Sequence, residues 1–197
     1  MKKLIIATKN EGKAREFRSL FPEGEVEVLS LLDLEEPLDV EETGNTFTEN
    51  AILKAEEISR KYQTTVIADD SGLEIDYLNG APGVYSARYA GAEKNDQDNI
   101  NKVLKELSGV PANKRTARFV CALAVSSPGK ETKTVTGTVD GYINEQREGN
   151  GGFGYDPIFF VKDKCRTMAE LTKEEKNAIS HRANALEKLQ GILPEYI

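Results

Sequence analysis

The chain has 197 residues, of which 39% are hydrophobic and 30% are charged, and its formal net charge is −7. This composition is typical of a globular protein that can bury a sizeable core, and it excludes a disordered chain. The negative charge argues against broad binding to nucleic acid or to an anionic membrane, so any anionic ligand has to be held by local cations.

In the N-terminal residues MKKLIIATKN, two lysines at positions 2 and 3 precede only a short apolar run. This run is too short for a signal-peptide core or a membrane span, and no later run reaches the necessary length. The two cysteines, Cys121 and Cys165, form neither a metal cluster nor a disulfide framework, so we expect reduced thiols and a cytoplasmic protein. His181 is the only histidine, which excludes zinc sites built from several histidines.

The first part of the chain predicts alternating strands and helices. Apolar runs predict strands over residues 2–7 and 26–29, with a helix over residues 12–20 between them. Apolar residues at helical spacing predict a helix over residues 47–62, and residues 65–68 predict the next strand. This alternation indicates an α/β sheet.

The pattern changes in the second part of the chain. A helix expected over residues 95–107 precedes two long strands, over residues 116–125 and 131–143, which are joined by a hairpin at SSPGK. Residues 171–191 predict a helix that opens with a capping box from Thr172 to Glu175. We therefore predict one α/β domain over residues 1–197, made of two lobes with a mixed sheet, flanking helices and a cleft between the lobes.

The stretch ATKNEGKAREF, which follows the first predicted strand, is a candidate anion site. Ligands of open α/β sheets collect at the carboxyl ends of strands, where a helix that begins there offers backbone N–H groups. Thr8, Asn10 and Lys13 would add a hydroxyl, an amide and a cation. The same residues also fit plain helix capping, with Lys13 in solvent.

Acidic residues follow the predicted strand at residues 65–68. The step Asp69-Asp70-Ser71-Gly72 could hold Mg²⁺, which takes a few carboxylates plus phosphate oxygens and waters, or it could accept a proton from water. Taken alone, Asp-Ser-Gly is more typical of a simple turn. Glu42 and Lys54 would supply a second metal ligand and a phosphate clamp, although spacing alone does not separate Glu42 from Glu41, and acidic loops are usually only solvated.

Two later stretches are candidates for holding a base. GNGGFGYDPIFF has four glycines within six residues, and Phe153 and Tyr155 could stack on a flat ring while Asp156 accepts hydrogen bonds. It could also be a hairpin turn with two core aromatics. In KNAISHR, Lys176 and Arg182 point apart on a straight helix, so either the helix is kinked near Ser180 or they touch different parts of one ligand. A lone His-Arg pair is also typical of a helix surface.

Six stretches together resemble one family. In chain order they are ATKNEGKAREF, EETGNTFTENAILKA, ADDSGL, GAPGVYSARYAG, GGFGYDPIF and EEKNAISHR. They resemble the inosine triphosphate pyrophosphatase family, whose members are also described as XTP/dITP diphosphatases that act on non-standard purine nucleotides. The resemblance implies a two-lobed mixed α/β fold, a homodimer, and Mg²⁺-dependent hydrolysis of dITP, ITP and XTP to the monophosphate and pyrophosphate.

The resemblance also implies roles for single residues. Asp70 matches the catalytic proton acceptor and metal ligand, Glu42 matches the second metal ligand, and water is expected to attack the α-phosphorus. The matched substrate-binding positions are Thr8, Lys9, Asn10, Glu11, Gly12, Lys13, Lys54, Ser71, Phe153, Gly154, Tyr155, Asp156, Lys176, His181 and Arg182. Lys9 stands where several members have glycine, which leaves the detailed shape of that turn open.

Two other functions remain as alternatives. A related pyrophosphatase, such as a member of the septum-formation inhibitor-like group, would act on other modified bases. A nucleotide-binding sensor would keep the base loop and the lysines without needing Asp70. For the enzyme we expect a small-molecule nucleotide as substrate, with neither nucleic acid nor membrane as a partner.

Overall fold

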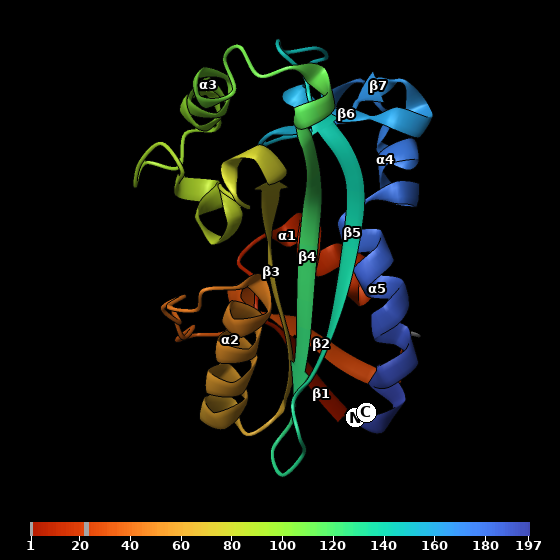
Figure 1. Ribbon diagram of the computed structural model, residues 1–197. Coiled ribbons are helices and arrows are strands. Elements are labelled where there is room, and N and C mark those ends of the chain that lie inside the picture. Colours follow the sequence, from red (N-terminus) through yellow and green to blue (C-terminus); the bar gives the residue numbers. More distant parts are fainter. Residues whose placement is uncertain (1, 22–23) are drawn as a thin grey trace. The chain divides into compact units, whose positions relative to one another are not determined.

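A computed structural model describes residues 2–21 and 24–197 (Figure 1). Seven strands form one mixed sheet in the order β2-β1-β3-β4-β5-β6-β7, and this confirms the predicted α/β class. The strands are β1 (Lys2–Ile6), β2 (Val26–Ser30), β3 (Thr65–Ile75), β4 (Thr116–Ser126), β5 (Lys133–Ile143), β6 (Phe159–Val161) and β7 (Arg166–Thr167). The helices are α1 (Glu11–Arg18), α2 (Phe47–Tyr62), α3 (Asp96–Glu106), α4 (Lys173–Ile179) and α5 (His181–Ile192).

The chain divides into two compact units, each made of separate segments. Unit 1 holds the described residues up to Asp70 together with Cys121–Gly137 and Asn184–Ile197. Unit 2 holds Ser71–Val120 and Thr138–Ala183. Strands β3, β4 and β5 each contribute residues to both units. Each unit is described here by itself, and the cleft expected between the lobes stays a prediction.

Unit 1 is built on parallel strands. β1 pairs with β2 from Lys2↔Val26 to Ile6↔Ser30, and with β3 from Leu4↔Thr65 to Ile6↔Ile67. The apolar run of β1 is buried along most of its length, as expected for a parallel strand covered on both faces. The predicted helix over residues 47–62 is α2, which runs beside the first part of β3 (Figure 1).

Strand β3 is longer than its apolar run predicts. It continues through residues 69–72 to Ile75, so the expectation that the strand ends at Ala68, with these polar residues in a turn, is wrong. The pairing with β1 stops at Ile67, because β1 itself ends at Ile6. Beyond this point Leu73 and Ile75 are fully buried in the core of unit 2, which explains why the backbone stays extended.

Unit 2 contains the helix expected over residues 95–107, observed as α3. Asn95 caps α3 by accepting a hydrogen bond from the N–H of Asp98 (3.1 Å). Antiparallel pairing joins β5 to β6 through Tyr142↔Phe160, and β7 follows β6. The two long strands predicted on either side of the SSPGK hairpin are confirmed as β4 and β5.

The helix predicted over residues 171–191 is broken into α4 and α5. Ser180 lies between them with φ −63° and ψ 153°, which is extended backbone. Its hydroxyl accepts a hydrogen bond from the N–H of Ala183 (3.1 Å), so Ser180 caps the second helix. The capping box from Thr172 to Glu175 is present at the start of α4. The kink near Ser180, one of the two alternatives, is therefore confirmed.

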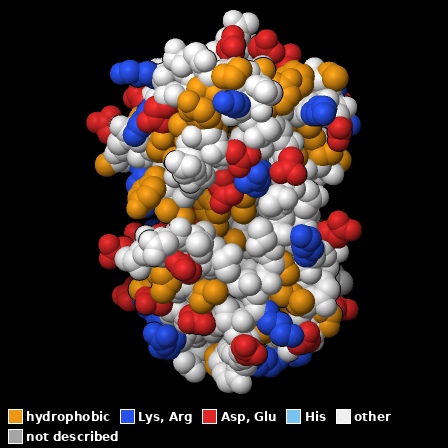
Figure 2. Space-filling view, viewed as in Figure 1, with side chains coloured by type: hydrophobic (Ala, Val, Ile, Leu, Met, Phe, Trp, Pro, Cys, Tyr) orange, Lys and Arg blue, Asp and Glu red, His pale blue; other side chains and the backbone are white. Residues whose placement is uncertain are grey.

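Charged side chains of both signs are interspersed on the face of each unit that Figure 2 shows. Within residues 2–21 and 24–197, no helix combines the length and the hydrophobicity that crossing a membrane requires.

Candidate active site

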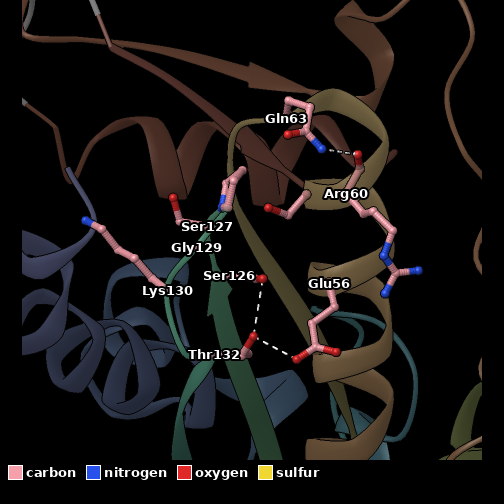
Figure 3. Close-up of a pocket in the computed structure, with 10 residues that line it drawn as sticks. Glu56, Arg60, Gln63, Ser126, Ser127, Gly129, Lys130 and Thr132 are labelled. Carbon is pink, nitrogen blue, oxygen red and sulfur yellow. Dashed lines mark hydrogen bonds between the residues drawn. The ribbon is translucent and has the colours of Figure 1, made fainter.

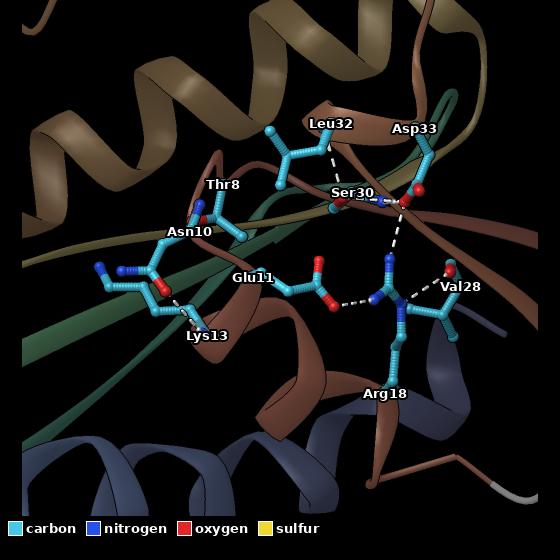
Figure 4. Close-up of polar contacts among 9 residues, drawn as sticks. All are labelled: Thr8, Asn10, Glu11, Lys13, Arg18, Val28, Ser30, Leu32 and Asp33. Atoms are coloured by element: carbon cyan, nitrogen blue, oxygen red, sulfur yellow. Dashed lines mark hydrogen bonds and ion pairs between the residues drawn. The ribbon is translucent and has the colours of Figure 1, made fainter.

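The candidate residues of unit 1 begin at the carboxyl end of β1 (Figure 4). The hydroxyl of Thr8 accepts a hydrogen bond from the N–H of Asn10 (3.1 Å), and the Asn10 side chain accepts one from the N–H of Lys13 (3.0 Å). Asn10 is therefore the N-cap of α1, so the capping interpretation is correct for this residue. Lys13 is not simply solvated, because its ammonium pairs with Asp69 at 2.5 Å.

Lys54 forms a second cationic contact with the same strand. Its ammonium lies 2.6 Å from Oε1 of Glu42 and also donates to the backbone carbonyl of Asp69. Burial opposes its charge, but Asp69 and Glu42 outweigh this and raise the pKa of Lys54 above its usual value. Glu42 is half-buried whereas Glu41 is exposed, which separates the two glutamates that spacing leaves equivalent.

Asp70 is next to this pair and is held by an amide. Nδ2 of Asn50 donates to Oδ2 of Asp70 at 3.0 Å. Burial raises the pKa of Asp70 to about 6, and Glu42 and Asp69 act in the same direction, while Lys54 and Asn50 oppose them. A carboxylate with this pKa is a better proton acceptor near neutral pH than an ordinary aspartate.

The charges of this cluster do not balance. Glu42, Asp69 and Asp70 are three carboxylates, and they face the two ammonium groups of Lys13 and Lys54. A nucleoside triphosphate would add further negative charge, so its binding here requires another cation. No group of three or more metal-ligating side chains occurs in the part of the chain that is described. The carboxylates of Glu42 and Asp70 fit Mg²⁺ shared with phosphate oxygens, because Mg²⁺ usually takes only one or two carboxylates from a protein.

Two of the predicted residues in this stretch have other contacts. Lys9 is exposed and pairs with Asp39 at 3.2 Å. The carboxylate of Glu11 accepts from the guanidinium of Arg18 (3.0 Å), which also binds Asp33 (2.7 Å; Figure 4). These contacts attach α1 to the segment after β2, so the side chain of Glu11 has a structural role here. Gly12 lies beside it in the first turn of α1.

The candidate residues of unit 2 include its glycine-rich loop. Gly152 has φ +71°, and a Cβ at this position would lie 2.0 Å from Oδ2 of Asp156. This oxygen accepts from the N–H of Phe153 (3.1 Å) and pairs with the ammonium of Lys176. The ring of Phe153 is 67% exposed, and Nζ of Lys176 lies 4.6 Å from its centre. An exposed ring beside a cation can stack on a flat, electron-rich heterocycle.

Tyr155 corrects the interpretation of this loop. Its side chain is 5% exposed, and its hydroxyl donates to the backbone carbonyl of Ser86 at 2.6 Å. Burial raises the pKa of this hydroxyl above its usual value. Tyr155 therefore anchors the loop in the core and offers no stacking surface, so the loop combines one core aromatic with one presented aromatic. The N–H of Gly154 donates to Asp96 at the start of α3 (2.9 Å), which is a second anchor.

The remaining predicted residues belong to β3 and α5. Ser71 is half-buried and directly follows Asp70 in β3. His181 and Arg182 open α5, and the ring of His181 stacks on Phe119 with centroids 5.2 Å apart. The structure thus gathers Thr8, Asn10, Lys13, Glu42, Lys54 and Asp70 in unit 1, and Phe153, Asp156 and Lys176 in unit 2.

Sequence reasoning missed the partners of these residues, namely Asn50, Ser86 and Asp96. Asn50 lies in the stretch EETGNTFTENAILKA, where an asparagine inside an apolar helical pattern was the available signal. Nothing local in the sequence marks Ser86 or Asp96 as anchors of the glycine-rich loop.

A separate pocket of about 390 Å³ lies between α2 and the β4–β5 hairpin (Figure 3). It is lined by Glu56, Ser59, Arg60, Gln63, Ser126, Ser127, Pro128, Gly129, Lys130 and Thr132. Some of its lining residues bond to one another: Thr132 donates to Glu56 (2.8 Å) and Gln63 donates to the carbonyl of Arg60 (2.7 Å). None of the predicted site residues lines it, so it is not the candidate active site.

Replacing Asp70 by asparagine is expected to stabilise the fold at pH 8. The folded state raises the pKa of Asp70 to about 6 from 3.8, so its ionisation costs at most about 3 kcal/mol above pH 6, and this cost disappears below about pH 4. Urea unfolding of Asp70→Asn and of the parent protein across this range measures the difference. Asp76→Asn is the control with the opposite sign, because hydrogen bonds from Thr116 and Arg118 lower the pKa of Asp76. A lower stability of Asp70→Asn at pH 8 would contradict the expectation.

Tyr155→Phe is expected to lower the free energy of unfolding by about 1 kcal/mol, because it removes one buried hydrogen bond. Tyr77→Phe is the matched control, since Tyr77 is 50% exposed and its hydroxyl should matter by less than about 0.5 kcal/mol. Urea denaturation of both variants tests this, and equal effects would show that the Tyr155 hydroxyl is not an anchor.

Comparison with known proteins places the chain in a family. A model described as the Ham1 family matches residues 4–192. The dITP/XTP pyrophosphatase of Bacillus licheniformis is 60% identical over 195 residues, covering 99% of this chain and 100% of that protein. The dITP/XTP pyrophosphatase of Bacillus subtilis is 60% identical over 193 residues, covering 98% of each.

Solved structures agree with this assignment. The Ham1 protein of Staphylococcus aureus superposes with a TM-score of 0.93 at 49% identity, covering 98% of this chain and 99% of that one. A nucleoside-triphosphatase, also named dITP/XTP pyrophosphatase, of Mycobacterium abscessus gives a TM-score of 0.84 at 43% identity, covering 95% and 98%. These similarities confirm the family resemblance inferred from the six stretches: the chain belongs to the Ham1 family.

Proposed function

We propose that this protein is a nucleoside triphosphate pyrophosphatase that hydrolyses dITP, ITP and XTP to the monophosphate and pyrophosphate. The observation that carries the proposal is the 60% identity, over nearly the full length of both chains, to proteins named dITP/XTP pyrophosphatase. Such an activity would remove deaminated purines from the nucleotide pool, and it would place the protein in the cytoplasm, as a homodimer if the family resemblance extends that far.

The cluster in unit 1 suits the triphosphate. An ammonium group has three N–H donors, so Lys13 and Lys54 can bind phosphate oxygens while they keep their contacts to Asp69 and Glu42. The N–H groups at the start of α1 would add further donors near Asn10. Asp70 would take the proton of the water that attacks the α-phosphorus.

Mg²⁺ is the cofactor that this proposal requires, with Glu42 and Asp70 as its protein ligands. When bound, the ion would supply the positive charge that three carboxylates and a triphosphate lack. Lys54 would orient Glu42, because its ammonium lies 2.6 Å from the carboxylate.

Base selection would fall to unit 2. Phe153 would stack on the purine, while the ion pair between Lys176 and Asp156 would hold the polar side of the loop in position. Deaminated purines carry a carbonyl at C6 where adenine carries an amine, so N–H donors such as those of His181, Arg182 or the loop backbone would favour the former. Rejection of guanine would have to act on its 2-amino group.

The proposed activity predicts a defined set of products. With Mg²⁺ and equal concentrations of dITP, XTP, dGTP and ATP, we expect rapid loss of dITP and XTP, one pyrophosphate per monophosphate, and no turnover in excess chelator. Ion-exchange chromatography of all products measures this. Formation of diphosphate with orthophosphate would exclude attack at the α-phosphorus. Hydrolysis of a modified pyrimidine triphosphate instead would favour the related pyrophosphatase group. Binding of ITP without turnover would favour a sensor.

Asp70→Asn is expected to lower kcat for dITP by at least about 10³-fold, because the amide can neither accept the proton nor supply a carboxylate ligand. Pyrophosphate release at pH 8 measures the loss, and circular dichroism establishes that the variant is folded. Asp76→Asn, a charge-matched change in a salt bridge of unit 2, is the control and should keep its kcat. A fully active Asp70→Asn protein would exclude the role of Asp70.

A further inference from the structure

Asn50 is a buried amide at the centre of the unit-1 cluster. It lies in the first turns of α2 and is 1% exposed. Its Nδ2 donates to Oδ2 of Asp70 (3.0 Å), and its Oδ1 accepts from the backbone N–H of Gly44 (2.7 Å). Both ends of the Asn50 amide are therefore hydrogen-bonded, one to the backbone before α2 and the other to the Asp70 carboxylate on β3.

The contact with Gly44 decides which way the amide of Asn50 points. A backbone N–H can only donate, so it requires the oxygen end of the side chain. The NH₂ end must then face Asp70, where it donates to a carboxylate that can only accept. A carboxylate rotates freely about its last bond unless a partner fixes it, because this torsion has broad, nearly two-fold wells. The directed donor at Oδ2 therefore restricts the plane that the Asp70 carboxylate can take.

Gly44 has to be a glycine for this arrangement to fit. A Cβ at position 44 would lie 2.7 Å from Oδ1 of Asn50 and 2.7 Å from Cβ of Glu49. Neither neighbour can move easily, because Asn50 is buried and both residues belong to α2. Any side chain at this position would push the amide of Asn50 away from its place beside Asp70.

We propose that Asn50, oriented by Gly44, is a positioning residue that sets the plane of the Asp70 carboxylate for the chemical step. This inference rests on the proposed function, since it concerns the residue assigned there as the proton acceptor. In this role Asn50 does not contact the nucleotide. The loss of Asn50 should therefore act on kcat and leave substrate binding nearly unchanged, because a group misplaced by a fraction of an ångström slows the reaction without weakening ground-state contacts.

The test compares two ways of disturbing the same link. Asn50→Leu keeps the size of the side chain and removes both polar ends, and Gly44→Ala keeps Asn50 but displaces its amide. For both variants we expect kcat with dITP to fall by about 10- to 100-fold, with KM changed by less than about threefold. Thermal unfolding of each variant fixes an assay temperature at which it is folded, and Gly44→Ala keeps the test valid if Asn50→Leu is too unstable.

Two matched controls separate positioning from general damage. Ser59→Ala removes another buried hydrogen bond of α2, from the Ser59 hydroxyl to the carbonyl of Thr64 (2.7 Å), and should lower stability without changing kcat. Gly191→Ala is a glycine substitution at a site where a Cβ meets no atom of the described chain within 4 Å, and it should keep full activity. If Asn50→Leu and Gly44→Ala match these controls in kcat, or if they raise KM instead, the positioning role is wrong.

The outcome for the proposed function is read separately. If the parent protein does not hydrolyse dITP, or if Asp70→Asn is fully active, the proposed function fails before Asn50 is considered. If the parent is active, Asp70→Asn is inactive and both Asn50→Leu and Gly44→Ala keep their kcat, only the inference on Asn50 is overturned.

Discussion

Two adjacent carboxylates on one extended strand must point to opposite faces of the sheet, and the arrangement of unit 1 depends on this. Asp69 lies on the same face of the sheet as Ile67, which packs with Phe17 of α1. Asp69 pairs with Lys13 of that helix. Asp70 points the other way and meets Asn50 of α2. Lys54 joins the two sides, because it binds Glu42 and the backbone carbonyl of Asp69. One strand thus presents a charge to each of two helices.

Burying these carboxylates destabilises the folded state, because they lose hydration. Asp69 is 5% exposed, and its ion pair with Lys13 compensates its desolvation. Asp70 is less well compensated, so its pKa rises to about 6. A group whose ionised form is destabilised in the folded state remains available to a proton or to a metal ion. The property that makes Asp70 reactive therefore also destabilises the folded state. The polar contacts around Asp70 limit this destabilisation.

The sequence predicted much of this arrangement where the signal was local. The helix over residues 47–62 has the observed bounds, because its apolar period and its N-cap lie within one stretch. The length of β3 was missed, since polar residues interrupt its apolar run and the burial of Leu73 and Ile75 depends on distant segments. The same reason explains Tyr155 and Phe153, which look alike in a glycine-rich loop. Tyr155 is a core residue because of partners far away in sequence, namely the carbonyl of Ser86 and the apolar cluster of unit 2.

The segmented make-up of unit 1 has a consequence for the order in which the protein is made. Its core joins Leu4 and Ile6 of the first strand to Leu189 and Tyr196, near the end of the chain, and the hydroxyl of Thr65 donates to the carbonyl of Tyr196 (3.3 Å). The residues around Asp70 are synthesised early, but the core beneath them is completed only by residues 184–197. On the ribosome, the nascent chain therefore carries β3, with its three carboxylates, without its supporting core until residues 184–197 have been synthesised.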